Sequence, residues 1–382
     1  MTGTYLLYGV PASYFTAKVR AYLRKQRLDF EERSSAHPEF GQTVYPATRR
    51  FLLPVLQWPC GDIVQDSDDI IERLEREEAG RLSCHPPGPV QNVLSHLFNL
   101  FGSEGLMRLA MHYRWSCLDQ QDSFIAEGFI HGIAPESPPE EAETLARPMM
   151  NKLAGYLEPL GVSDASIPAI EQAYDELLSA LQAHFTKHPC LFGAWPSLGD
   201  YGLFGALSPH LGRDPVPAQR MKSRAAKVYR WTERMAAPNL DIPEYPSYPH
   251  TAFLPDDEIP ETLDAVGRVA AGEMLPEFAD QMRAFNAWAE HQAREPGQPV
   301  LAKPHQRSAT RVTTAYRGTA YATGVPVYRI YLIQKLQTAA SRLSVPDRER
   351  LEAWFERTGL RDLLEIQSPY PVRRAGHLEV WA

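Results

Sequence analysis

The chain is predicted to have an α+β fold, with a small N-terminal domain of strands and helices followed by two mostly helical parts. An apolar segment at residues 4–10 runs into an amphipathic helical pattern, which is typical of a buried strand followed by a helix. Helical periodicity then dominates from residue 90 to residue 187. A proline-rich hinge precedes a further stretch of helical patterns. The expected parts are residues 1–82, 88–240 and 250–382.

The first helix is expected to begin directly after Ser13. Serine is a good N-cap residue, because its side-chain oxygen can accept a hydrogen bond from a free backbone N–H of the first helical turn. Apolar side chains then recur at the spacing of one core-facing helix surface, namely Phe15, Val19, Tyr22 and Leu23. The sequence therefore predicts a strand, a short turn and a helix whose N-terminus carries Ser13.

Two further features follow in this domain. Pro54 lies between the hydrophobic residues Leu53 and Val55, at the start of a second apolar segment. Asp66 and Ser67 precede an apolar stripe at helical spacing, formed by Ile70, Ile71 and Leu74. Both of these polar residues are good helix caps, so they predict a second helix start.

Together these segments resemble the thioredoxin-like domain of glutathione transferases of the serine and cysteine types. In that family the catalytic residue stands six positions before a buried valine of the first helix, and counting back from Val19 gives Ser13. Residues 52–56 (Leu-Leu-Pro-Val-Leu) resemble the cis-proline segment of the family, and Asp66-Ser67 resembles its Glu-Ser or Gln-Ser helix start. The match covers about the first 80 residues and continues more weakly to about residue 235.

The resemblance implies that Ser13 is catalytic and that glutathione is the cosubstrate. A free thiol has a pKa near 8.5, so little thiolate exists at neutral pH. A helix N-terminus favours an anion, and a hydroxyl there can donate a charge-assisted hydrogen bond to the thiolate sulfur. Ser13 could also serve only as the helix cap. Tyr8 is the other candidate, because some transferase classes use a tyrosine at the end of this strand.

The resemblance also implies the remaining contacts to glutathione. Leu53 would present its backbone N–H and C=O to the cysteinyl part, next to a cis Pro54. Ser67 and the helix N-terminus would bind the γ-glutamyl carboxylate, and Asp66 would bind the γ-glutamyl ammonium group. Arg50, or the arginine before it, could reach the glycyl carboxylate. The alternative for Pro54 is that it ends a strand at the edge of the sheet and has no role in binding. The alternative for Asp66 and Ser67 is that they cap their helix and bind no ligand.

A second motif supports the resemblance in the helical part. Ser197 and Asp200 have the spacing of a capping box, with Asp in place of the usual Glu or Gln. Residues 193–200 resemble the "Gly, two residues, Pro-Ser-x-Ala-Asp" motif in the all-helical C-terminal domain of the family, with Gly199 in place of the alanine. We expect Asp200 to hold a buried helix start and not to act as a catalytic acid.

An acceptor pocket is expected between the two domains, above Ser13. Candidates to line it come from an early helix of the second domain: Met107, Met111, Tyr113, Arg114 and Trp115. The substrate pocket is assigned to Met111, Tyr113 and Trp115. Because a methionine and aromatic stripe at helical spacing is common in any core, the alternative is that these residues only pack.

Composition excludes several classes of function. The formal net charge of −8 argues against nucleic acid as the main partner. No apolar run approaches the roughly 20 residues of a membrane span. The N-terminus shows no signal-peptide pattern. The four cysteines are scattered, form no CxxC or other metal-ligand pattern, and are typical of reduced thiols in a cytoplasmic protein.

The sequence therefore predicts a glutathione S-transferase whose thiolate attacks a small hydrophobic electrophile. A homodimer is implied by the resemblance, and no metal is expected. The alternative is a non-catalytic binding or scaffold module, because one fold can host both. The additional mostly helical extension has no chemistry of its own in the sequence. We expect it to pack on the transferase body and to narrow the acceptor pocket.

Overall fold

The computed structural model describes residues 3–249 and 252–382, so the expected starts of the first and third parts, at residues 1 and 250, lie outside the described residues. The N-terminal domain contains a four-stranded sheet in the order β2-β1-β3-β4. Its strands are β1 (Tyr5–Tyr8), β2 (Phe30–Arg33), β3 (Val55–Gln57) and β4 (Ile63–Gln65). β1 and β2 are parallel, and the other two pairs are antiparallel. Its helical segments are α1 (Tyr14–Gln26), η1 (Phe40–Val44), α2 (Tyr45–Thr48) and α3 (Ser67–Arg76).

The predicted helix after Ser13 is confirmed. The Oγ of Ser13 accepts a hydrogen bond from the backbone N–H of Thr16, which makes Ser13 the N-cap of α1. Val19 and Leu23 are fully buried on the face of α1 that packs into the core. The helix ends at Arg27, whose φ of 54° is left-handed and stops the helical path.

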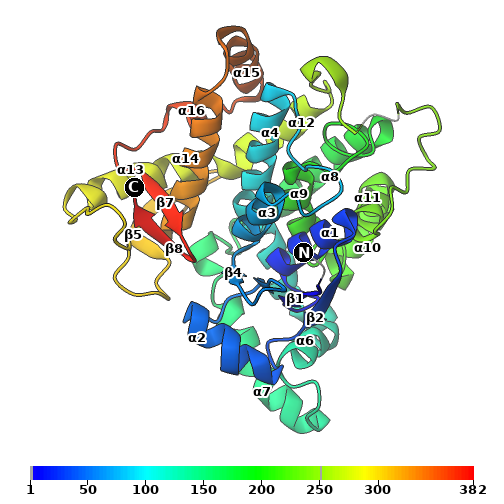
Figure 1. The fold of residues 1–382 in the computed structure, drawn as a ribbon, viewed down its shortest axis with the longest axis vertical. Coiled ribbons are helices and arrows are strands. Elements are labelled where there is room, and N and C mark those ends of the chain that lie inside the picture. The colour runs from blue at the N-terminus through cyan, green and yellow to red at the C-terminus, as the bar shows by residue number, and fades with distance from the viewer. Residues whose placement is uncertain (1–2, 250–251) are drawn as a thin grey trace.

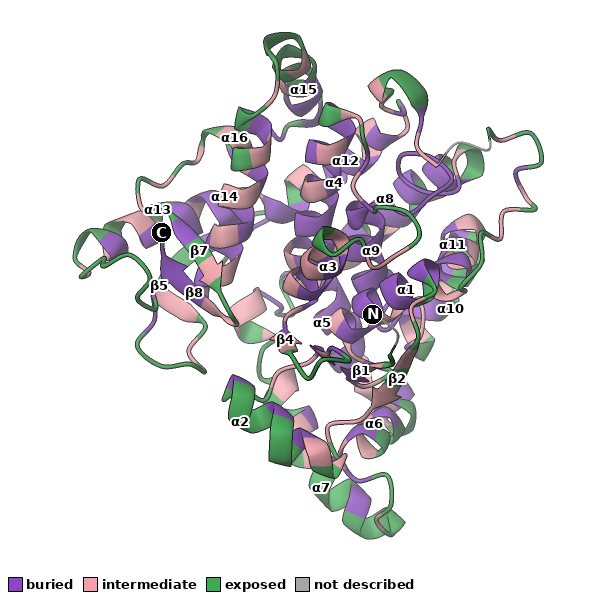
Figure 2. Ribbon diagram, viewed as in Figure 1, coloured by how far each residue is buried: buried purple, intermediate pink, exposed green. Residues whose placement is uncertain are grey.

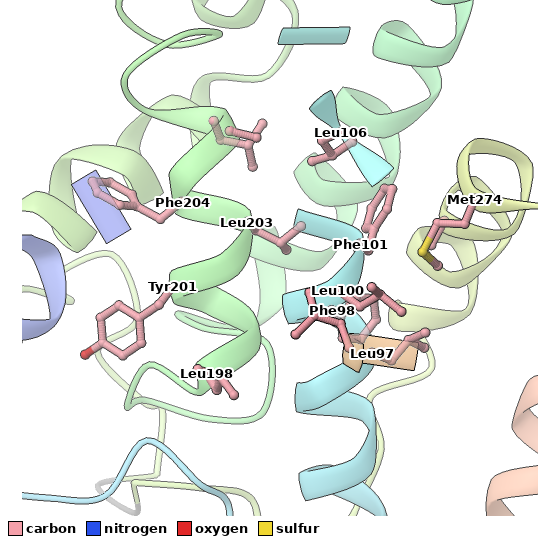
Figure 3. Close-up of a cluster of buried hydrophobic side chains, with 14 of the residues drawn as sticks. Leu97, Phe98, Leu100, Phe101, Leu106, Leu198, Tyr201, Leu203, Phe204 and Met274 are labelled. Carbon is pink, nitrogen blue, oxygen red and sulfur yellow. The ribbon is translucent and has the colours of Figure 1, made fainter. Parts of the chain in front are cut away.

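The second part is helical throughout. Its segments are α4 (Pro89–Leu100), η2 (Phe101–Gly105), α5 (Met107–Trp115), α6 (Leu118–Ile133), α7 (Pro139–Ala154), η3 (Glu158–Leu160), α8 (Ile167–Lys187), α9 (Leu198–Leu207), α10 (Pro215–Arg224) and α11 (Ala226–Ala236). Every residue of α9 is buried, and Figure 2 shows α9 and α4 as largely buried while α2 and α7 are mostly exposed. Figure 3 shows Leu203 of α9 directed toward Phe101 of η2, while Tyr201 and Phe204 point to the opposite side of α9.

The predicted capping box at the start of α9 is confirmed. The Oδ2 of Asp200 accepts hydrogen bonds from the N–H and the hydroxyl of Ser197, and its Oδ1 accepts one from the N–H of Leu191. Asp200 is completely buried, so its carboxylate satisfies donors that no water could reach. This agrees with the structural role expected for Asp200.

The extension is a mixed structure. It contains η4 (Pro255–Asp257), α12 (Leu263–Met274), α13 (Glu277–Glu290), β5 (Ser308–Tyr316), β6 (Thr319–Pro326), α14 (Val327–Ser341), α15 (Val345–Thr358), α16 (Asp362–Glu365), β7 (Val372–Ala375) and β8 (Leu378–Trp381). The strands form two antiparallel hairpins, β5-β6 and β7-β8. Residues 310–321 lie within the first hairpin, which turns at Arg317 and Gly318.

The extension shares one continuous hydrophobic core with the rest of the chain. Buried side chains from all three parts belong to it, including Val19, Phe98, Trp231, Phe285 and Trp354. In Figure 1, α13, α14 and both hairpins lie on one side of α4, while α1, α10 and α11 lie on the other. The three segments therefore pack as one body, and their division into three domains stays a proposal.

Buried ion pairs also join the extension to the helical part. The guanidinium of Arg108 on α5 donates to Glu277 of α13 and to the hydroxyl of Tyr321 on β6. Arg329 on α14 donates to the same Glu277 and to Glu104 of η2, at 2.9 Å for the latter. Because buried charges are tolerated only when they are well paired, these contacts specify how the extension packs.

No helix in the described part of the chain is long and apolar enough to cross a membrane.

His184 on α8 provides a pH-dependent link to the extension. Its Nδ1 lies 2.8 Å from the hydroxyl of Thr262, and its Nε2 lies 3.1 Å from the carbonyl oxygen of Cys190. Burial, reinforced by the neighbouring His188, lowers the pKa of His184 to about 3. A neutral imidazole that donates from Nε2 and accepts at Nδ1 satisfies both contacts.

We expect acidification to destabilise the protein through His184. Between the folded pKa of about 3 and the unfolded value of 6.5, the unfolded state binds more protons. Stability from this group is complete above pH 6.5 and falls by up to about 1.4 kcal/mol per pH unit below it. Thermal unfolding of wild type and His184→Gln at pH 7 and pH 5 measures this. The gap between the two midpoints should shrink at pH 5, and a constant gap would contradict the assignment.

Candidate active site

The site is centred on Ser13, at the junction of the N-terminal sheet and the helical part. The Oγ of Ser13 accepts from the N–H of Thr16 at 3.3 Å, and its own hydroxyl proton makes no hydrogen bond within the described residues. Capping uses a lone pair of the oxygen, so the proton is left to donate elsewhere. Ser13 is half-buried and borders a cavity. It can therefore cap α1 and also donate its hydroxyl proton to a thiolate bound in that cavity.

The segment directly before β3 contains the expected cis proline. The Leu53–Pro54 peptide bond is cis, and β3 begins directly after it. In the described part of the chain, neither the N–H nor the C=O of Leu53 has a hydrogen-bond partner. Leu53 therefore offers a free donor and a free acceptor next to the cavity.

A mainly apolar cavity of about 300 Å³ lies between the N-terminal domain and helices α5, α6 and α7. Ser13, Leu52 and Leu53 of the N-terminal domain line it, together with Met111 and Trp115 of α5, as expected for these last two residues. Further lining residues are Met107, Phe129, Met149 and Leu153. The cavity can hold a small hydrophobic molecule beside the hydroxyl of Ser13.

The expected role of Tyr113 in this pocket is wrong. Tyr113 is almost completely buried on another face of α5, where its ring lies 5.0 Å from the ring of Tyr174 on α8. The reason is helical phase. Met107, Met111 and Trp115 are spaced by four residues and share one face, whereas Tyr113 is two residues away from that face.

The expected narrowing of this cavity by the extension is also wrong. Among the described residues, none that line the cavity comes from beyond His210. The extension instead packs against α4, α8, η2 and η3, and it reaches α3 through side-chain hydrogen bonds.

Arg114 supports the segment that carries Ser13. Its guanidinium donates to both carboxylate oxygens of Asp214, at 2.7 and 2.9 Å, and to the carbonyl oxygen of Ala12 at 3.0 Å. Arg114 and Asp214 are both buried, so the pair is shielded from water. Burial raises the pKa of Asp214 and outweighs the lowering effect of Arg114. The pair fixes the backbone directly before Ser13.

Asp66 and Ser67 form the start of α3, as expected. Asp66 is the N-cap, and its carboxylate accepts from the N–H of Asp68 at 2.9 Å. Its backbone φ of 95° is unusual for a residue other than glycine and stores local strain. Ser67 is buried at the first position of the helix. The free N–H groups of this first turn favour an anion.

Arg50 is occupied by the extension. Its guanidinium donates to the carbonyl oxygens of Pro304 and, at 2.8 Å, His377. It is also buried, with 5% of its surface exposed. The expected contact to a glycyl carboxylate would have to share a guanidinium that already has two acceptors.

Tyr8 does not line the cavity. Its hydroxyl donates to Glu39 at 3.0 Å, and its ring packs in a small cluster with Phe40, Val44 and Val55. It is completely buried there. This placement favours Ser13 over Tyr8 as the residue that faces a thiolate.

One group of side chains in the described residues has the proximity of metal ligands. Ligand atoms of Glu75, Cys84 and His85 lie within 4.8 Å of one another. The carboxylate of Glu75 already accepts from the Cys84 N–H at 3.1 Å and from the hydroxyl of Tyr22 at 2.6 Å. Burial raises the pKa of the Cys84 thiol well above its usual range, which disfavours the thiolate that a metal needs. The expectation of no metal stays a prediction.

The sequence interpretation missed several residues of the site. Phe129, Met149 and Leu153 reach the cavity from α6 and α7, and Tyr328 reaches Asp66 from α14. For Phe129, Met149 and Leu153, the only signal in the sequence was their apolar positions on α6 and α7. For Tyr328, no neighbouring residue in the sequence indicates a contact with Asp66.

The fold combines a thioredoxin-like sheet, a cis proline directly before β3, and a helical domain that closes an apolar cavity. Residues 7–82 match the family described as glutathione S-transferase, N-terminal domain. For this N-terminal domain, the match confirms the resemblance to glutathione transferases that was seen in the sequence.

Solved structures of similar proteins have low sequence identity to the chain. A glutathione transferase from Phanerochaete chrysosporium is 19% identical, with a TM-score of 0.43, and the match covers 63% of this chain and 98% of that one. A β-etherase from Sphingobium is 18% identical, with a TM-score of 0.41, covering 62% and 96%. A GST-like protein from Pseudomonas syringae is 17% identical, with a TM-score of 0.41, covering 84% and 86%. No curated protein sequence matches the chain significantly.

Proposed function

We propose that the protein binds glutathione and activates its thiolate for attack on a small hydrophobic electrophile. One observation carries the proposal: the Ser13 hydroxyl at the N-terminus of α1 and the free backbone of Leu53 both border one apolar cavity. A thiol held between them would lie next to any apolar molecule in that cavity. The match of residues 7–82 to the family supports glutathione as the thiol.

The chemistry follows from the local dipoles. The N-terminal end of α1 and the hydroxyl of Ser13 both favour a negatively charged sulfur, which lowers the pKa of the bound thiol. The thiolate attacks the electrophilic carbon and forms a carbon–sulfur bond, while a leaving group departs with its electron pair or the electrons move into the acceptor. The proton lost from the thiol goes to solvent. Ser13 keeps its own proton.

Glutathione itself would be bound by the remaining groups. The Leu53 backbone would pair with the cysteinyl part, as an added strand does. Ser67 and the first turn of α3 would bind the γ-glutamyl carboxylate, and Asp66 would bind the ammonium group. Arg50 is the weakest of these assignments, because the extension already holds its guanidinium.

Calorimetric titration of the full chain with glutathione tests the proposal. We expect saturable binding by wild type and by Ser13→Ala, with weaker thiolate stabilisation in the variant. Absence of binding by wild type would favour the alternative, a non-catalytic binding or scaffold module.

A homodimer, a cytoplasmic location and the three-domain division also stay proposals. A homodimer would have to use surfaces other than the sides of α3 and α4 that the extension covers.

The apolar cavity is proposed to bind the acceptor, and Met111 tests this. Met111→Gln places an amide in a buried apolar wall, where an unpaired polar group costs about 1–3 kcal/mol. We expect the KM for a hydrophobic electrophile to rise about tenfold, while the Kd for glutathione stays within about twofold. Steady-state kinetics and calorimetry measure the two effects.

The matched control is Met111→Leu, which conserves volume and apolar character and should behave like wild type. If the glutamine variant leaves the acceptor KM unchanged, the acceptor does not bind in this cavity. If both constants change together, the substitution has disturbed the fold of the site.

A further inference from the structure

The extension reaches the part of the proposed glutathione site that is assigned to the γ-glutamyl moiety. The hydroxyl of Tyr328, near the start of α14, donates to Oδ1 of Asp66 at 2.8 Å. The same hydroxyl lies 3.3 Å from Oδ2 of Asp68. These residues are 262 positions apart in the sequence, so the contact exists only because the extension folds back on the N-terminal domain.

Further ties hold this part of the extension against α3. Lys335 of α14 pairs with Glu72 at 2.6 Å, and Arg374 of β7 pairs with Asp69 at 2.6 Å. The guanidinium of Arg374 also lies 5.4 Å from the ring centroid of Tyr328. Both Arg374 and Lys335 are largely shielded from solvent. Tyr328 is therefore held in place from two elements, and its hydroxyl has little freedom to leave Asp66.

The two oxygens of Asp66 differ in how they are used. Oδ1 accepts from the N–H of Asp68 at 2.9 Å and from the Tyr328 hydroxyl. Oδ2 has no hydrogen-bond partner among the residues that the structure describes. Asp66 also keeps a left-handed backbone with a φ of 95°, so its position is maintained by its neighbours and not by its own preference.

We infer that Tyr328 is a positioning residue of the glutathione site: by holding Oδ1 of Asp66, it presents Oδ2 to the ammonium group of the γ-glutamyl moiety. This inference rests on the proposed function and deepens it, because it assigns to the extension a part in recognising the thiol cosubstrate. The extension then has a role distinct from the expected narrowing of the acceptor pocket.

The physical reason is preorganisation. An aspartate fixed by two donors on one oxygen loses less conformational freedom when a cation binds the other oxygen. Without the Tyr328 hydroxyl, the carboxylate can rotate, and part of the binding free energy is used to fix it. The effect requires a cationic group on the ligand. A thiol ligand of the same shape without the amino group should gain nothing from Tyr328.

The experiment compares two ligands on the full chain. The ligands are glutathione and glutaryl-cysteinyl-glycine, which lacks only the γ-glutamyl amino group. Calorimetry is performed on wild type, Tyr328→Phe, Asp66→Asn and the double variant. We expect Tyr328→Phe to weaken glutathione binding about fivefold, as for loss of one hydrogen bond to a charged group, and to leave the glutaryl analogue unchanged. In the Asp66→Asn background, the tyrosine substitution should have no further effect on glutathione.

The matched control is Tyr331→Phe, one turn further along α14. The hydroxyl of Tyr331 makes no hydrogen bond within the described residues, so its removal should leave the affinity for both ligands unchanged. Thermal unfolding of each variant confirms that the fold is intact. A merely structural role of Tyr328 would weaken both ligands equally, and it would not depend on Asp66.

Three outcomes would overturn the inference. Unchanged or tighter glutathione binding by Tyr328→Phe would remove Tyr328 from the site while leaving the proposed function in place. An equal loss for both ligands would assign to it only a structural role. Absence of glutathione binding by wild type would overturn the proposed function itself, and this inference with it.

Discussion

Replacement of Ser13 by alanine is expected to lower kcat for glutathione conjugation about 100-fold, the scale seen when one donor to a developing or stabilised anion is removed. The hydroxyl of Ser13 is the side-chain donor that we assign to the thiolate, and alanine leaves only the helix N-terminus. Glutathione should still bind, since the γ-glutamyl contacts are unaffected. Steady-state kinetics with a small apolar electrophile, together with calorimetry, separates these two effects.

Ser35→Ala is the matched control, because Ser35 lines the same cavity but donates its hydroxyl proton to the carbonyl oxygen of Gly132 at 3.1 Å. This variant should keep kcat within about threefold of wild type. If Ser13→Ala retains full activity, Ser13 is only the cap of α1. Thermal unfolding of Ser13→Ala should show the loss of about 1 kcal/mol that an N-cap substitution costs.

Replacement of Arg114 by methionine is expected to cost about 3–5 kcal/mol of stability, because it leaves the carboxylate of Asp214 buried without its cationic partner. The same change removes the hydrogen bond to the carbonyl oxygen of Ala12, directly before Ser13. We therefore expect both a lower thermal midpoint and a lower kcat. Thermal unfolding and kinetics below the midpoint of the variant measure them.

A second variant separates the ion pair from the site. Arg114→Met combined with Asp214→Leu removes both charges, and stability should recover by several kcal/mol relative to the single variant. The exposed pair of Arg361 and Glu365 on α16 and its flank is the control, and Arg361→Met should change stability by no more than about 0.5 kcal/mol. An Arg114→Met protein as stable as wild type would contradict the account of this pair.

The parts of the site that could be predicted from the sequence are those determined by local contacts. Ser13 caps α1 through a hydrogen bond to a residue three positions away, and the capping box of Ser197 and Asp200 has the same short range. The cis bond before Pro54 was expected from the family resemblance, and the structure contains it. The two helix caps each lie within a segment of a few residues, where spacing alone carries the information.

The parts that could not be predicted depend on the phase of a helix or on contacts distant in sequence. Tyr113 is only two positions from Met111, but two positions along a helix turn the side chain to another face, so it does not share the cavity with Met111. The partners of Arg50 and Asp66 come from the extension, which begins about 200 residues later and carries no pattern that points to α3. The composition of the extension indicates that it folds, but it does not indicate which surface of the N-terminal domain it contacts.

The pKa of the glutathione thiol in the complex with wild type is the most direct test of the account. It can be measured from the ultraviolet absorbance of the thiolate as the pH is varied at saturating glutathione. We expect a pKa at least one unit below the value of about 8.5 for a free thiol, because Ser13 and the N-terminus of α1 favour the thiolate. A bound thiol that titrates at the value of free glutathione would contradict the assignment of Ser13 and of the site around it.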